Sequence, residues 1–159
     1  MIGRMFTVGG LTLLSRLTGF ARDIILAAVL IEKLKIFSDE ISVRDRIAQR
    51  YSKHLSDLAA VPQLARGTTS VWAQYTIRLR SGRRDAFADA LKAQGIPTAV
   101  YYPIPLNRQE AYRHFPVADG GVPVSEQLAA EVISLPMHAY LDEATQGRII
   151  AASRQALAG

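Results

Sequence analysis

The nine residues Thr98–Leu106, TAVYYPIPL, set the tightest limit on how this chain folds. A run of β-branched and aromatic residues favours a strand, and Pro103 and Pro105 end it because each fixes φ and removes a backbone donor. Neighbouring side chains on a strand point to opposite faces, so one of Tyr101 and Tyr102 packs while the other offers its hydroxyl to a cleft. These residues alone leave two readings open: a core strand with an aromatic end, or the edge of a binding site.

The remaining chain predicts an α+β fold, a small sheet with covering helices. The clearest strand is Val71–Leu79, where apolar residues alternate at period two. Apolar residues at threes and fours, together with capping signals, predict the helices. They span residues 39–58 after a break near Phe37, 84–94 with Gly95 as the stop, 106–113, 125–134, and a last helix from Asp142 or Glu143 with Ile149, Ile150 and Leu157 facing inward.

Composition argues against several kinds of site. The chain has no cysteine, which excludes disulfides and thiolate metal sites. His54, His114 and His138 lie far apart without the spacing of metal ligands, so we expect no metal site. The net charge is +5, yet the arginines alternate with carboxylates, as in Arg44-Asp45-Arg46. This pattern is typical of solvated helix faces, and we expect no nucleic-acid partner.

The first thirty residues differ from the rest. Residues 5–31 are long and apolar enough for a spanning helix of about 20 residues, but Arg16, Arg22 and Asp23 are costly inside a bilayer. The stretch Thr7–Asp23, TVGGLTLLSRLTGFARD, resembles the first transmembrane helix of the lipid II flippase (MviN-type) family. In that family the arginines matching Arg16 and Arg22 face a central cavity and are implicated in binding anionic lipid-linked substrate. The match covers fewer than thirty residues, so it indicates a fragment and not a flippase.

A second resemblance covers residues 27–159. It rests on AAVLIEKL at 27–34, SVWAQY at 70–75, GIPTAVYYP at 95–103 and LPMH at 135–138. Together these motifs resemble the C-terminal small domain of the DegT/StrS-type sugar-nucleotide aminotransferases, which have the fold of type I pyridoxal-phosphate enzymes. The resemblance implies amino transfer, usually from glutamate, to a keto sugar carried by a nucleotide diphosphate. It also implies a homodimer and a role in making polysaccharide or antibiotic sugars.

The resemblance also divides the active site. The Schiff-base lysine, the acid at the pyridinium nitrogen and the phosphate cup lie in the family's large domain, upstream of the matched part. The resemblance therefore assigns no catalytic and no cofactor-binding residue here, and we do not expect this chain alone to bind pyridoxal phosphate or to transaminate. It implies a substrate-binding role for Tyr102 first. Weaker candidates are Tyr101, at a position where many members have histidine, and Asn107, Arg108 and His138.

Two domains are predicted: an apolar helical leader over residues 1–29 and the aminotransferase-like domain over 30–159. Three hypotheses follow from this division. The first is a part of an aminotransferase that is inactive by itself and lies in the cytoplasm. The second is an interaction module, because a free small domain exposes an apolar surface. The third is a domain tethered to a membrane through residues 5–31.

Overall fold

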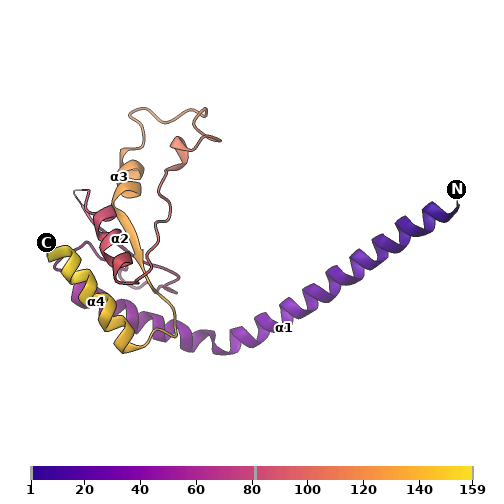
Figure 1. The fold of residues 1–159 in the computed structure, drawn as a ribbon, viewed down its shortest axis with the longest axis horizontal. Coiled ribbons are helices and arrows are strands. Elements are labelled where there is room, and N and C mark those ends of the chain that lie inside the picture. Colours follow the sequence, from indigo (N-terminus) through magenta and orange to yellow (C-terminus); the bar gives the residue numbers. More distant parts are fainter. Residues whose placement is uncertain (1, 81, 159) are drawn as a thin grey trace. The chain divides into compact units, whose positions relative to one another are not determined.

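The computed structural model describes residues 2–80 and 82–158, without the side chains of residues 2–14 and 17. Figure 1 shows the elements along the chain. In order they are α1 (Ile2–Leu55), β1 (Tyr75–Arg78), α2 (Arg84–Ala93), the 3-10 helix η1 (Leu106–Arg108), α3 (Pro123–Glu131), β2 (Val132–Leu135) and α4 (Glu143–Ala158). The chain divides into two compact units, residues 1–40 and 41–159. The first unit is helical, and the second holds the sheet and the other helices.

The sheet consists of β1 and β2, paired antiparallel. Tyr75 lies opposite Leu135 and Ile77 opposite Ile133, and all four side chains are buried. The alternate residues face the other way: the Thr76 hydroxyl lies 2.7 Å from that of Ser134. In β1 buried and partly exposed residues alternate, as a short strand with one covered face requires, whereas in β2 Ser134 is buried as well. The predicted α+β fold with a small sheet is confirmed in this form.

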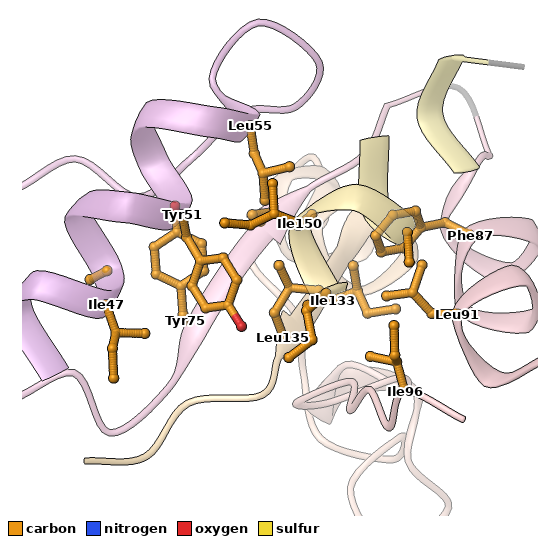
Figure 2. Close-up of a cluster of buried hydrophobic side chains, with 14 of the residues drawn as sticks. Ile47, Tyr51, Leu55, Tyr75, Phe87, Leu91, Ile96, Ile133, Leu135 and Ile150 are labelled. Atoms are coloured by element: carbon orange, nitrogen blue, oxygen red, sulfur yellow. The ribbon is translucent and has the colours of Figure 1, made fainter. Parts of the chain in front are cut away.

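The core lies between the end of α1, the sheet, α2 and α4 (Figure 2). Tyr51 from α1 packs on Tyr75 from β1, with ring centroids 5.0 Å apart. Phe87 and Leu91 of α2 occupy successive turns of one helix face, as their i, i+4 spacing predicts. The other buried apolar residues include Ile47, Leu55, Ile77, Ile96, Ile133, Leu135, Ile149, Ile150 and Leu157. The predicted inward positions in the last helix are confirmed.

Polar groups fix the end of α1 against the rest of this unit. The Gln146 side chain, almost fully buried, donates to the Ile47 carbonyl at 2.8 Å. The Tyr51 hydroxyl donates to the Pro136 carbonyl at 3.0 Å. Burial raises the pKa of Tyr51 above its usual range, so the phenol stays protonated and acts as a donor. Each buried polar group named here thus has a hydrogen-bond partner, and this bond offsets the cost of removing the group from water.

Several helix and turn predictions are confirmed. Helix α2 occupies 84–93, and Gly95 follows it at φ 71°, the left-handed conformation in which glycine ends helices. Asp142 begins α4 as predicted: its carboxylate accepts from the backbone N–H of Thr145 at 2.8 Å. The predicted strand 71–79 is confirmed only over Tyr75–Arg78, because Trp72 has φ 47° and Val71 is exposed. A left-handed residue breaks the extended backbone that a strand needs.

Three predictions are wrong. The expected break near Phe37 does not occur, because α1 continues through it without glycine or proline to interrupt the hydrogen bonds. The predicted helix 125–134 ends at Glu131, and residues 132–135 form β2 because they pair with β1. The predicted helix 106–113 is only η1 followed by turns.

The stretch Thr98–Leu106 is not a strand either. It makes a single bridge to the sheet: Ala99 and Ser134 exchange backbone hydrogen bonds, at 3.2 and 2.7 Å. Beyond that bridge the chain leaves β2, and Pro103 and Pro105 offer no N–H for further pairing. Pairing with the sheet therefore stops at Ala99, before either proline is reached.

The hypothesis of a membrane tether through residues 5–31 gains no support from the structure. Residues 2–40 are helical, but among the residues that the structure describes no helix is both long enough and apolar enough to cross a bilayer. Arg22 and Asp23 form an exposed ion pair at 2.9 Å on this helix, and Arg16 is exposed. The side chains of residues 7–14 in the flippase-like stretch lie outside the described part. The two-unit division falls after Glu40, later than the predicted boundary at residue 29.

Candidate functional site

The two tyrosines that follow the Ala99 bridge stand at the surface. Tyr101 is 51% exposed and Tyr102 is 75% exposed. Their ring centroids lie 6.5 Å apart at 79°, an edge-to-face arrangement, and the peptide bond between them is cis. The expectation that one ring packs and the other faces a cleft is wrong, since both rings border the same hollow. The strand geometry behind that expectation is missing at these residues.

This hollow, which we call the tyrosine hollow, has a volume of about 700 Å³. Residues of β1 and β2 line it together with residues of α3 on one side and of the proline segment, η1 and the following turns on the other. Its lining is mostly apolar, with hydroxyl and amide groups between the apolar side chains. The lining residues are Thr76, Tyr101, Tyr102, Ile104, Pro105, Leu106, Gln109, Tyr112, Ser125, Leu128, Ala129 and Val132. Such a mixture suits a ligand with apolar faces and hydroxyl edges.

Asn107 and Arg108 are brought together by one carboxylate on α3. Arg108 donates to both oxygens of Glu126, at 2.9 and 2.7 Å, and the Asn107 amide donates to the same carboxylate at 3.2 Å. The Arg108 guanidinium, followed by the Asn107 amide, holds the pKa of Glu126 below its usual range. Both predicted residues thus fasten η1 to α3 beside the tyrosine hollow and do not line it.

His138 lies apart from the other candidates. It belongs to the loop between β2 and α4, where its carbonyl accepts from the backbone N–H of Leu141 at 3.2 Å. Its side chain is exposed and does not line the tyrosine hollow. The structure therefore brings Tyr101 and Tyr102 together, places Asn107 and Arg108 behind the wall of the hollow, and leaves His138 elsewhere. The substrate-binding roles of all five stay predictions.

Sequence reasoning missed other polar residues of the hollow. Thr76 was available from the period-two pattern of β1, because it alternates with the buried Tyr75 and Ile77 and so faces the other side. Tyr112 and Gln109 lie in turns after η1, which carry no periodic signal. Ser125 lies in the first turn of α3, where the predicted helix gives it no role in a site. Only the folded chain brings these residues to one place.

Known proteins resemble this fold and sequence. The sequence profile of the DegT/DnrJ/EryC1/StrS aminotransferase family matches residues 19–154. The chain belongs to this family. The match begins inside α1, so residues 19–29, predicted as a separate leader, are part of the family match. The flippase resemblance gains no support from these comparisons. The predicted aminotransferase family is confirmed.

Two relatives show how much of the family this chain represents. UDP-2-acetamido-2-deoxy-3-oxo-D-glucuronate aminotransferase of Pseudomonas aeruginosa is 44% identical over 133 residues, which are 82% of this chain and 35% of that protein. The crystal structure of a DegT DnrJ EryC1 StrS aminotransferase from Brucella abortus is 50% identical, with a TM-score of 0.79 over 84% of this chain and 35% of the other. The chain spans about a third of the length of the relatives it matches.

A third match is the Streptomyces venezuelae protein DesV, solved in complex with a ketimine intermediate. It is 33% identical, with a TM-score of 0.76, and the match covers 81% of this chain and 35% of that one. The family's aminotransferases depend on pyridoxal phosphate, which needs a lysine for its Schiff base. No lysine lines the tyrosine hollow. Lys33 and Lys35 are paired with Glu40 and Glu32 in α1. The exposed Lys53 and Lys92 do not line the hollow either, so none of the chain's lysines offers it an amine for a Schiff base.

Proposed function

We propose that this chain supplies the sugar-facing surface of a sugar-nucleotide aminotransferase and does not transfer amino groups by itself. The observation that carries the proposal is the tyrosine hollow, where two adjacent exposed tyrosines border an apolar space of about 700 Å³. The family match and the relatives, which are named as sugar-nucleotide aminotransferases, support the substrate class. The homodimer and cytoplasmic location expected from the sequence belong to the same proposal.

The chemistry of the hollow favours a sugar over a plainly charged ligand. A sugar ring presents C–H faces that pack on aromatic rings, and hydroxyl edges that pair with tyrosine, serine or threonine. Tyr101 and Tyr102 offer rings set at 79°, so one ligand contacts a face of one and an edge of the other. No charged side chain lines the hollow, since Arg108 is held behind its wall by Glu126. The diphosphate of a nucleotide sugar therefore points away from this surface.

The test is binding of UDP-N-acetylglucosamine, a nucleotide sugar, measured by saturation-transfer NMR on the 159-residue chain. We expect saturation of the sugar protons, lost in Tyr102→Ala and reduced in Tyr102→Phe, which keeps the ring and removes the hydroxyl. Tyr140→Ala is the matched control, because Tyr140 is 71% exposed but lies outside the hollow. Equal signals in Tyr102→Ala and Tyr140→Ala contradict the proposal, as does transfer to the uracil protons alone.

A further inference from the structure

One long segment forms half of the tyrosine hollow without a buried side chain to hold it in place. Residues 102–121, which we call the η1 segment, are the loop in Figure 1 that carries η1 and leads into α3. The segment contributes six of the twelve residues that line the hollow. All of its residues are exposed or only half-buried. Such a segment gains little from apolar burial, so other contacts have to set its position.

Hydrogen bonds to one carboxylate join the η1 segment to another element. Arg108 donates to both oxygens of Glu126 on α3, and the Asn107 amide donates to one of them. In the part of the chain that the structure describes, the other hydrogen bonds of residues 102–121 stay within the segment. One example is the bond from the Gln109 side chain to the Ile104 carbonyl, at 3.2 Å. Glu126 therefore anchors the segment to the rest of the fold.

The anchoring carboxylate stands on a helix that is itself fixed. Ala129 of α3 is buried, and its carbonyl accepts from the Arg84 side chain of α2 at 2.6 Å. Glu131, at the end of α3, forms an ion pair with Arg78 of β1. Helix α3 is thus tied to both α2 and the sheet, and Glu126 in its first turn offers η1 an acceptor of fixed position.

The same bonds connect the two sides of the tyrosine hollow. Arg108 precedes Gln109 and Glu126 follows Ser125, and both of these neighbours line the hollow. A change in the distance between Arg108 and Glu126 therefore moves one side of the hollow relative to the other. The Arg108 guanidinium holds the pKa of Glu126 below its usual range, so the carboxylate stays ionised near neutral pH and the bonds stay charge-assisted.

We propose that Glu126 is a positioning residue for sugar binding: it holds the η1 segment against α3 and keeps Tyr102 at the spacing that the ligand requires. Glu126 does not line the hollow, so it acts through Asn107 and Arg108. The nature of the ligand rests on the proposed function, whereas the anchoring of the segment does not. Without the carboxylate, the segment keeps its internal turns but loses its bonds to α3.

Backbone order parameters from nitrogen-15 relaxation of the 159-residue chain test the anchoring without any ligand. For residues 106–112 we expect values near those of rigid backbone, about 0.85, in the natural chain and below about 0.6 in Glu126→Ala. The exchanged pair Arg108→Glu/Glu126→Arg reverses the two charges and is expected to recover most of the loss. The matched control is Glu110→Ala, which removes an exposed glutamate whose ion pair with Arg113 lies within the segment.

Three results overturn the proposal. They are unchanged order parameters in Glu126→Ala, low values already present in the natural chain, and equal losses in Glu126→Ala and Glu110→Ala. Near-ultraviolet circular dichroism of the packed Trp72 and Tyr75 shows whether each variant keeps the fold of residues 41–158.

Saturation transfer to UDP-N-acetylglucosamine then links the anchoring to binding. We expect the sugar signal to fall about three- to fivefold in Glu126→Ala, the range for an exposed ion pair of good geometry, and to return in the exchanged pair. A full sugar signal in Glu126→Ala despite lost order contradicts the positioning role. A natural chain that is ordered at residues 106–112 but gives no sugar signal overturns the proposed function instead, while the order parameters still decide whether Glu126 anchors the segment.

Discussion

The single helix α1 carries two stretches of apolar residues that end in opposite environments. Ile47, Tyr51 and Leu55 are buried against β1, β2 and α4, whereas Phe20 and Leu34 remain two-thirds exposed. Burying a side chain of this size stabilises a fold by about 1.5–3 kcal/mol, so the first stretch contributes to the stability of residues 41–158 and the second forgoes that gain. The difference shows that apolar periodicity predicts which face of a helix is suited to burial, but not which part of the molecule or which other molecule buries it.

The largest expected effect separates a buried isoleucine from an exposed one. Ile133→Ala in β2 removes a fully buried side chain that pairs opposite Ile77. It is expected to lower the free energy of unfolding by about 2–5 kcal/mol, the cost of lost burial plus a cavity. The matched control is Ile25→Ala in α1, where the side chain is 63% exposed, and this change is expected to alter the free energy of unfolding by less than about 0.5 kcal/mol. Urea unfolding followed by Trp72 fluorescence measures both, and equal losses break the comparison.

An element of this fold could be predicted from the sequence when the residues that determine it lie close together along the chain. Gly95, Asp142 and the i, i+4 pair Phe87 and Leu91 act within one or two helical turns, and each was predicted correctly. Strand β2 was missed because it follows α3 directly, with no glycine, proline or other turn residue to separate them.

The conformation of Val132–Leu135 is set by pairing, because these residues become a strand only when they pair with β1, which lies more than fifty residues before them in the sequence. The same limit applies to the tyrosine hollow. Its most prominent residues, Tyr101 and Tyr102, were named from the motif. Thr76 lies on β1, whereas Gln109 and Tyr112 lie in the turns after η1, far along the chain, and only folding gathers them.

A smaller effect is expected from a single hydrogen bond at the packed end of α1. Tyr51→Phe keeps the ring against Tyr75 but removes the bond from the hydroxyl to the Pro136 carbonyl. We expect a loss of about 0.5–1.5 kcal/mol in the free energy of unfolding, the usual net value of one hydrogen bond. Tyr102→Phe is the control, because its ring is 75% exposed and the change is expected to leave stability unaltered. No loss in Tyr51→Phe, measured by thermal unfolding, contradicts the assigned bond.

The smallest effect concerns how the helices begin. Helix α1 has no acidic residue in its first turn, whereas α4 is preceded by the capping residue Asp142. The pKa of Asp142 is held below its usual range chiefly by the backbone N–H of Thr145 and by the Thr145 hydroxyl. A depressed pKa adds stability above the ordinary aspartate value, and this stability is lost as pH falls through the folded-state value.

Asp142→Asn keeps a capping oxygen without a titrating charge. Its stability is therefore expected to fall less steeply than that of the natural chain between neutral pH and about pH 3. Asp142→Ala removes the cap and is expected to be less stable at every pH in that range. Thermal melts as a function of pH measure both variants. The same acid dependence in Asp142→Asn as in the natural chain shows that this cap does not contribute to it.

The central claim is that these residues hold the sugar-facing surface of an aminotransferase without its covalent chemistry. The most direct test mixes the purified 159-residue chain with pyridoxal phosphate, reduces with borohydride, and maps the adducts by mass spectrometry. The account predicts only scattered, substoichiometric labelling of surface lysines such as Lys53 and Lys92. One lysine labelled stoichiometrically, with a matching absorbance shift, contradicts it and shows that the chain holds the cofactor itself.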